Sequence, residues 1–161
     1  MHGEPLPDLR TLTDDGGRTD VAASLSGGSV LHASDLFFSS PHNLIAPGDS
    51  HGMHDGWETR RRRGEGHDWV VLRLAAETEI ERVDVDTSNF KGNYPDTCSL
   101  DVRVTPDVAA DPGAEPAWSE VLSRRKLGPH RRVAFPIDPP ALATQVRLNI
   151  HPDGGVARLR V

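Results

Sequence analysis

The chain has 161 residues, a formal net charge of −6 at pH 7 and a single cysteine, Cys98. This length fits one domain with one core, and the acidic charge argues against a general role in binding nucleic acid or a membrane surface. One cysteine excludes an internal disulfide, and no apolar run approaches the roughly 20 residues of a membrane span. We therefore expect a cytoplasmic protein with no nucleic-acid partner and no membrane partner.

The N-terminal residues 1–20 are rich in Pro, Gly, Asp and Thr and show no apolar period. Such a composition predicts a flexible tail or linker. The folded domain is expected to span residues 21–161. Near its start, Asp35 to Phe38 is predicted to form a short helical turn, capped by Asp35 or Ser34 and ended by Pro41.

Beyond this turn, apolar residues recur with period two in several short segments, which predicts strands with one buried face. Val70 to Leu74 is more continuously apolar and fits a central strand. Thr105 to Pro116 is expected to be an exposed loop, and no segment keeps a helical period. The prediction is an all-β fold, an antiparallel β-sandwich or jelly roll. The strand segments are Val83 and Val85; Leu100, Val102 and Val104; Val133, Phe135 and Ile137; Val146, Leu148 and Ile150; and Leu159 and Val161.

The segment from Asp55 to Trp69 combines acids, a histidine, four consecutive arginines and two tryptophans. In an extended chain, successive side chains point to opposite faces, so only alternate arginines such as Arg60 and Arg62 can converge on one ligand. A guanidinium can make two parallel bonds to a carboxylate. A small carboxylate anion therefore fits this segment better than a polyanion, and Trp57 is expected to wall the site.

Possible acids and bases lie within the same segment, at Asp55, Glu58 and His67. Neighbouring cations would keep the carboxylates ionised, whereas burial against Trp57 would raise their pKa values. The sequence leaves this balance open. The alternative for each acid is a structural ion pair with one of the four arginines.

Two histidines just before this segment, His51 and His54, could join His67 in a metal site. Their spacing is weak evidence, because histidine is also common in exposed glycine-rich loops. We predict no metal and no cofactor, with a divalent ion on these three histidines as the alternative.

Two later segments also carry polar residues that could bind a ligand. Asp86 is out of phase with the apolar positions of its strand, and the strand leads into a loop that contains Asn93. That loop could also form a simple turn. Arg147, Asn149 and His151 alternate with apolar residues and share the face opposite the core.

Residues 55–69, 86–98 and 147–160 together resemble the repeat unit of allantoicase. The similarity runs from about Gly28 to Val161, and the second string is most similar to the C-terminal repeat. The resemblance implies a β jelly roll of the galactose-binding-like type and two such repeats in one chain. It also implies conversion of allantoate and water to ureidoglycolate and urea. Residues 1–20 would then correspond to the linker between repeats.

Allantoate carries a carboxylate and two ureido groups, so its site needs cations together with hydrogen-bond donors and acceptors. We hypothesise that Glu58 or His67 protonates the leaving nitrogen, that Asp55 or Asp86 takes a proton from water, and that Arg60 or Arg62 anchors the carboxylate. The expected catalytic residues are Asp55, Glu58, His67 and Asp86, and the expected substrate-binding residues are Trp57, Arg60, Arg62, Asn93, Arg147 and Asn149.

No internal repeat is visible within the chain. If the site lies between repeats, the chain must form a homo-oligomer or pair with a second allantoicase repeat. Two alternatives to an independent enzyme are therefore a half-enzyme subunit that needs a second repeat and a non-catalytic jelly-roll binding module.

Overall fold

The computed structural model describes residues 17–105 and 116–161. Within these ranges the chain is nearly all antiparallel β-structure, and no helix is long and apolar enough to cross a membrane. The strands are β1 (Ser29–Ala33), β2 (Trp57–Glu58), β3 (Asp68–Asp86), β4 (Thr97–Arg103), β5 (Ser119–Lys126), β6 (Arg132–His151), β7 (Gly155–Val156) and β8 (Arg158–Arg160), and the short 3-10 helices are η2 (Ser24–Ser26), η3 (Pro41–Ile45) and η4 (Met53–Asp55).

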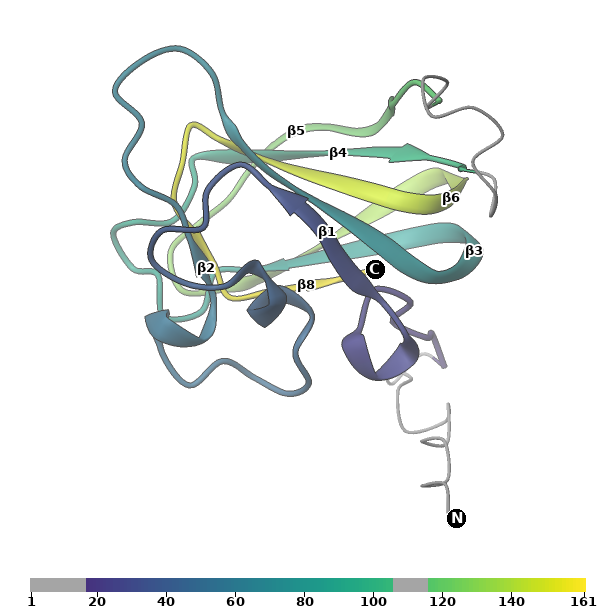
Figure 1. The fold of residues 1–161 in the computed structure, drawn as a ribbon, viewed down its shortest axis with the longest axis horizontal. Helices are drawn as coiled ribbons and strands as arrows, with labels where there is room; N and C mark the ends of the chain where they lie inside the picture. The colour runs from purple at the N-terminus through teal and green to yellow at the C-terminus, as the bar shows by residue number, and fades with distance from the viewer. Residues whose placement is uncertain (1–16, 106–115) are drawn as a thin grey trace.

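Two long strands, β3 and β6, form the frame of the molecule. The first part of β3 pairs with the last part of β6, from Asp68 with Ile150 to Arg73 with Gln145, and the second part of β3 pairs with the first part of β6. The register shifts between Arg73 and Thr78, where both strands curve back (Figure 1). The sheet therefore folds over into two layers, with β1, β4 and β5 extending one layer and β8 the other.

The core lies between these layers and is formed by the predicted alternating apolar positions. Val70 and Leu148 from one layer, and Val85 and Leu159 from the other, have no exposed surface. The predicted central strand at Val70–Leu74 lies inside β3, between β1 and β6. The period-two pattern therefore predicted most of the buried faces correctly, and the antiparallel sandwich is confirmed. Val104 is the exception, because it follows the end of β4 and is exposed.

The predicted helical turn at residues 35–38 is wrong. Asp35 instead accepts a hydrogen bond from the Phe37 N–H at 2.8 Å in an irregular segment. The helical turn η3 begins at Pro41, where Ser40 caps it by accepting from the His42 N–H. Proline was expected to end a helix, but it suits the first helical position, where no N–H is needed.

The predicted tail mostly falls on residues outside the described ranges. Its last residue, Asp20, is well anchored, because its Oδ1 accepts the N–H groups of Ala22, Ala23 and Val161, each at 3.1 Å. The Val21 N–H donates to the Val161 carbonyl at 2.8 Å. The chain thus enters the domain beside its last strand. The predicted loop at residues 105–116 also lies almost wholly outside the described ranges.

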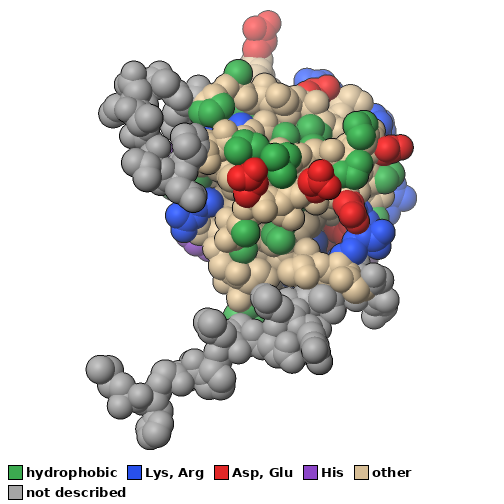
Figure 2. All heavy atoms as spheres, turned by 90° about the vertical axis from the view of Figure 1, so that its right-hand side faces the viewer, with side chains coloured by type: hydrophobic (Ala, Val, Ile, Leu, Met, Phe, Trp, Pro, Cys, Tyr) green, Lys and Arg blue, Asp and Glu red, His purple; other side chains and the backbone are tan. Residues whose placement is uncertain are grey.

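The two ends of the sandwich differ. Figure 1 shows the long loop that leads into β3, the connection after β3 and the segment after β6 at one end. The other end holds the bend of β3 and β6, and there Figure 2 shows apolar side chains scattered among acidic and basic ones. The irregular backbone is thus concentrated at the first end, as is typical of ligand-binding sites on β-sandwiches.

Trp57 anchors this end to the core. Its side chain is fully buried, and its Nε1–H donates to the Asp35 carbonyl at 2.9 Å. The structure thus places Trp57 in the core, although we expected it to wall a site.

We expect Trp57→Phe to lower the free energy of unfolding by about 1–3 kcal/mol, because the Asp35 carbonyl loses its buried donor. Urea denaturation followed by circular dichroism measures this loss. The half-buried Trp69 provides a control, since Trp69→Phe should cost less. Equal losses in the two variants would contradict a special anchoring role for Trp57.

Candidate functional site

The loop end brings together the three segments that suggested a site. β2 pairs with β7, with Trp57 opposite Val156 and Glu58 opposite Gly155. The Gly155 N–H donates to the Asn93 carbonyl at 2.8 Å. Residues 58, 93 and 155 are far apart in sequence, but the segments that carry them are therefore in direct contact.

Two glycines permit this close approach. Gly154 has a φ of 134°, and a Cβ there would lie 2.8 Å from the Asn93 carbonyl oxygen. A Cβ on Gly155 would collide with the ring of Phe90. Because neither glycine has a side chain, the loop after β3 can pack directly against residues 154 and 155.

Glu58 and Asn93 form a short contact on this surface. The Asn93 Nδ2 donates to Glu58 Oε1 at 2.6 Å, and both side chains are only partly buried. The Glu58 backbone N–H donates to Ser39 Oγ at 3.1 Å, which fixes the start of the side chain. Within the described ranges Glu58 Oε2 has no hydrogen-bond partner, so this carboxylate can still take or give a proton.

Asp55 lies against a buried arginine of β8. Arg158 donates to Asp55 Oδ2 at 2.9 Å and is only 3% exposed, and the His51 N–H donates to the same oxygen at 3.0 Å. Burial acts to raise the pKa of Asp55, but the His51 N–H and the Arg158 guanidinium outweigh it and hold the pKa below its ordinary value. Asp55 is therefore ionised at neutral pH and fastens η4 to β8.

Asp86 ends β3 and is almost fully buried. It does lie out of phase with Val83 and Val85, but the opposite face of the strand is itself covered. Its Oδ1 accepts the Ser88 N–H at 2.8 Å, which shapes the turn into the loop.

The two predicted anchoring arginines each contact a different buried aspartate. Arg60 Nε lies 3.0 Å from Asp35 Oδ2, and the side chain stays 61% exposed. Arg62 donates to Asp68 Oδ1 at 2.9 Å and to the His67 carbonyl at 3.2 Å. The arginine run lies in the loop at residues 59–67 and not in a strand. We expected strand geometry to point alternate arginines to the same side. The arginines are not in a strand, so this expectation was wrong.

His67, Asn149 and Arg147 are joined by one polar network on the outer face of the larger layer. His67 Nε2 lies 3.1 Å from Asn149 Oδ1, and the Asn149 Nδ2 donates to Asp101 Oδ2 at 2.8 Å. Arg147 donates to the same Asp101 oxygen from Nε and Nη2, at 2.9 and 2.8 Å. Its guanidinium also lies 4.8 Å from the centre of the Trp118 ring.

Asp101 and Ser99 were missed by the sequence analysis. Both alternate with apolar residues of β4, as Arg147 and Asn149 do in β6, and this alternation was the available signal. In the structure Ser99 pairs with Asn149 and Asp101 with Arg147 across the two strands. Only the pairing of β4 with β6 shows that these polar residues share one face.

His151 packs against His67 at the end of the network. The ring centres lie 4.6 Å apart, and His151 Nε2 lies 3.3 Å from Ser99 Oγ. Burial, together with the charges of Arg124 and His67, lowers the pKa of His151 to about 4 against the opposing effect of Asp101. This ring is therefore neutral at physiological pH.

The alternative metal site on His51, His54 and His67 finds no support in the described residues. Within residues 17–105 and 116–161, no three His, Cys, Asp or Glu side chains are grouped so that they could hold a metal ion. The absence of a cofactor stays a prediction.

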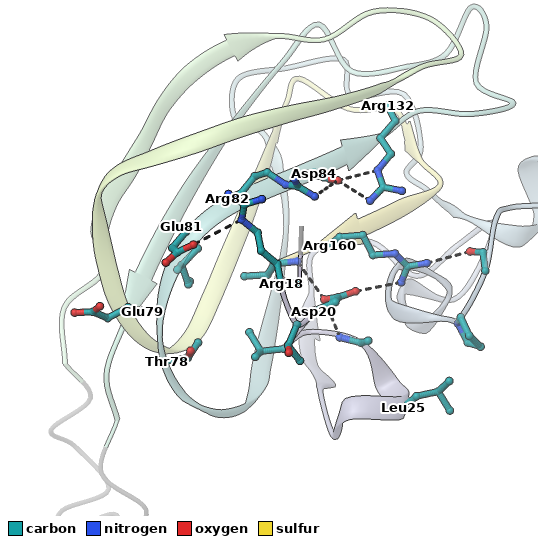
Figure 3. A pocket seen from close by; sticks show the side chains of 18 residues that line it. Arg18, Asp20, Leu25, Thr78, Glu79, Glu81, Arg82, Asp84, Arg132 and Arg160 are labelled. Atoms are coloured by element: carbon teal, nitrogen blue, oxygen red, sulfur yellow. Dashed lines mark hydrogen bonds and ion pairs between the residues drawn. The ribbon is translucent and has the colours of Figure 1, made fainter. Parts of the chain in front are cut away.

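A cavity of about 770 Å³ lies elsewhere, between the chain entry at residues 17–25 and the second layer. Figure 3 shows its charged lining, where Arg160 faces Asp20 and Arg132 and Arg82 face Asp84. Four arginines and four acids line it, so its formal charge is balanced. None of the predicted site residues lines this cavity, and the loop end remains the better candidate for a carboxylate ligand.

Comparison with known proteins adds independent information. Residues 19–161 match the family model described as Allantoicase repeat. Allantoicase from Dictyostelium discoideum is 43% identical over 157 residues, which cover 94% of this chain and 42% of that protein. The solved structure of allantoicase from Saccharomyces cerevisiae superposes with a TM-score of 0.79 at 36% identity, over 88% of this chain and 42% of that one.

A more distant likeness concerns the fold alone. An F5/8 type C domain from Bacteroides fragilis superposes with a TM-score of 0.62 at 17% identity, over 84% of this chain and 90% of that one. The sandwich is therefore of the galactose-binding-like type. The chain spans about half the length of the curated relatives it matches.

The lowered pKa of His151 makes stability depend on pH. Because the unfolded imidazole takes up a proton near its ordinary pKa of 6.5 and the folded one near 4, stability is fully present above 6.5 and is lost as the pH falls toward 4.

We expect His151→Gln, whose amide does not titrate, to lose about 1 kcal/mol less stability than the unmodified chain between pH 7 and pH 5. Urea denaturation at both pH values measures the difference. Equal losses in the two proteins would show that His151 is not the group responsible.

Proposed function

The chain belongs to the allantoicase family, and from this premise we propose that it is one repeat of an enzyme that converts allantoate and water to ureidoglycolate and urea. The observation that carries the proposal is that the family match extends over residues 19–161, the whole folded domain. The meeting of Glu58, Asn93 and the loop at residues 59–67 at one end of the sandwich supports it, because these segments carry groups that suit the substrate.

The substrate determines which groups are needed. A carboxylate calls for a cation that can make directed hydrogen bonds, and we assign this task to Arg60 or Arg62. The ureido groups both donate and accept hydrogen bonds, which an amide such as Asn93 can match. Arg147 and Asn149 are bound to Asp101, so we place them behind the site.

In the proposed reaction, the bond between the central carbon and one ureido nitrogen breaks as an acid protonates that nitrogen, and urea leaves. Water then adds to the carbon and gives up a proton to a base, so that a hydroxyl replaces the lost group. We assign these proton transfers to Glu58 and His67. Each is partly exposed, and in the described residues Glu58 Oε2 and His67 Nδ1 have no hydrogen-bond partner.

Asp55 and Asp86, the other two expected catalytic residues, receive supporting roles in this proposal. Asp55 is tied to Arg158, and Asp86 to the turn at Ser88. Both hold loops of the site, and Asp55 stays ionised because its pKa is lowered. The scheme uses side chains alone and retains the prediction that no metal or cofactor takes part.

The length of the chain bears on its assembly. Because the curated relatives are about twice as long, we propose that activity needs either a second copy of this chain or a second repeat. Under this proposal the chain by itself is a half-enzyme, and the cytoplasm remains the expected compartment.

Release of urea and ureidoglycolate from allantoate tests the proposal. The purified chain is assayed over a range of concentrations, with and without a chelator and a co-expressed second repeat. We expect turnover that survives chelation and rises with self-association or with the added repeat. No turnover under any of these conditions would contradict the proposed activity, and turnover lost on chelation would revive the histidine metal site.

Glu58→Gln keeps the size of the side chain and removes its ability to exchange a proton. We expect kcat to fall by about 100-fold or more, the range of a lost general acid or base, with the unfolding transition unchanged. Glu65→Gln is the matched control, because Glu65 is an exposed acid of the neighbouring loop. Turnover of Glu58→Gln close to that of the control would remove Glu58 from the mechanism.

A further inference from the structure

We propose that Asp101 and Asn149 are positioning residues that hold His67 with its Nε2 proton directed into the protein and its Nδ1 directed to the substrate. The inference rests on the proposed function for its catalytic meaning. The orientation and tautomer of the His67 ring are inferred independently, from the hydrogen bonds that Asn149 makes to His67 and Asp101.

The first step concerns the amide of Asn149. Asp101 Oδ2 accepts two bonds from Arg147, and a carboxylate paired with a guanidinium in this way stays charged and can only accept. The group that Asn149 turns toward Asp101, at 2.8 Å, must therefore be its NH₂. The same NH₂ lies 3.3 Å from Ser99 Oγ, so both of its hydrogens are used.

The second step concerns His67. With its NH₂ toward Asp101, Asn149 presents its carbonyl oxygen to His67 Nε2 at 3.1 Å. An amide oxygen has no proton to give, so Nε2 must carry the hydrogen. In the neutral ring the lone pair is then on Nδ1, which has no partner among the described residues and can exchange a proton with a bound molecule.

The third step concerns the charges around the ring. His151 packs on His67 and stays neutral at physiological pH, because its pKa is about 4. Arg62, which is in the same loop as His67, donates to the His67 carbonyl and is paired with the buried Asp68. The other charges that act on His151 come from Arg124 on β5 and Asp101 on β4.

This arrangement suits proton transfer to the leaving nitrogen. When Nδ1 is protonated, the positive ring keeps its Nε2 bond to Asn149, and the Asp101 carboxylate behind the amide favours that charge. Nδ1–H gives its proton to the nitrogen of the departing urea, and the neutral ring recovers a proton when water adds. Asn149 and Asp101 touch no substrate in this scheme and act only through His67.

The burial of the network agrees with a positioning role. Asn149 is 5% exposed, Asp101 7% and Ser99 4%, although all three lie on the outer face of a sheet. Buried polar groups are costly unless they are fully paired, and a paired network holds its members in one geometry. A purely structural network would also be buried, so the test must report on the ring itself.

Two substitutions of Asn149 should move the pKa of His67 in opposite directions. Asn149→Asp places a negative charge against Nε2 and should raise the pKa by about one unit or more, whereas Asn149→Leu removes the acceptor and should lower it. NMR titration of the His67 ring protons measures both shifts without any need for activity. Gln145→Leu is the control, because Gln145 is on the same face of β6 but accepts from Arg103.

Asp101→Asn, which keeps the shape of the side chain, provides a second variant should Asn149→Leu fail to fold. It should also lower the pKa of His67, because the charge behind the amide is lost. Unchanged His67 titration in Asn149→Asp and Asp101→Asn would overturn the inference and leave the network a structural one.

The pH profile of kcat for allantoate separates this inference from the proposed function. If both hold, the limb of the profile that reports His67 shifts with its NMR pKa in each variant. If the NMR shifts occur in a chain that never turns over allantoate, the positioning of the ring stands and the proposed reaction fails. If the pH profile of kcat stays the same in variants whose NMR pKa for His67 has shifted, His67 does not take part in the reaction.

Discussion

The register between β3 and β6 is the constraint on which the rest of the structure depends. Because both strands run through the two layers, the start of β3 at Asp68 and its end at Asp86 both lie toward the same end of the sandwich. The loop before β3, the loop after it and the turn after β6 are thereby brought together. A shift of one residue in this pairing would exchange the core and outer faces of each strand, and Asn149 would no longer share a face with Asp101.

Around this frame, several arginines near the site pair with aspartates of neighbouring segments. Arg158 is almost fully buried and holds η4 through Asp55, Arg147 holds Asp101, and Arg62 holds Asp68. Ion pairs with one buried partner add little net stability, but removal of the other partner leaves that buried charge uncompensated. Their main effect is therefore to hold the loops in one geometry, within which Glu58 Oε2 and His67 Nδ1 have no hydrogen-bond partner among the described residues.

The loop end and the balanced cavity have different electrostatic characters. In the cavity the arginines face acids that line the same hollow, so an added anion would have to displace an existing partner. At the loop end Arg60 is more than half exposed despite its contact with Asp35, and it lies over the ring of Phe37.

The sequence by itself determined the fold class, most of the buried faces of the strands and the segments that meet at the candidate site, because period-two burial and unusual local composition are properties of neighbouring residues. It also named His67, Glu58 and Asn93 as candidate site residues, and these stay predictions. Only the tertiary structure decided the partners: Trp57 lies in the core, Asn149 contacts His67 instead of the solvent, and Asp101 joins the network because β4 pairs with β6. Such contacts join residues far apart in the chain, 82 positions for Asn149 with His67 and 48 for Asn149 with Asp101. No local pattern specifies them, since they depend on strand register and on how the sheet folds over.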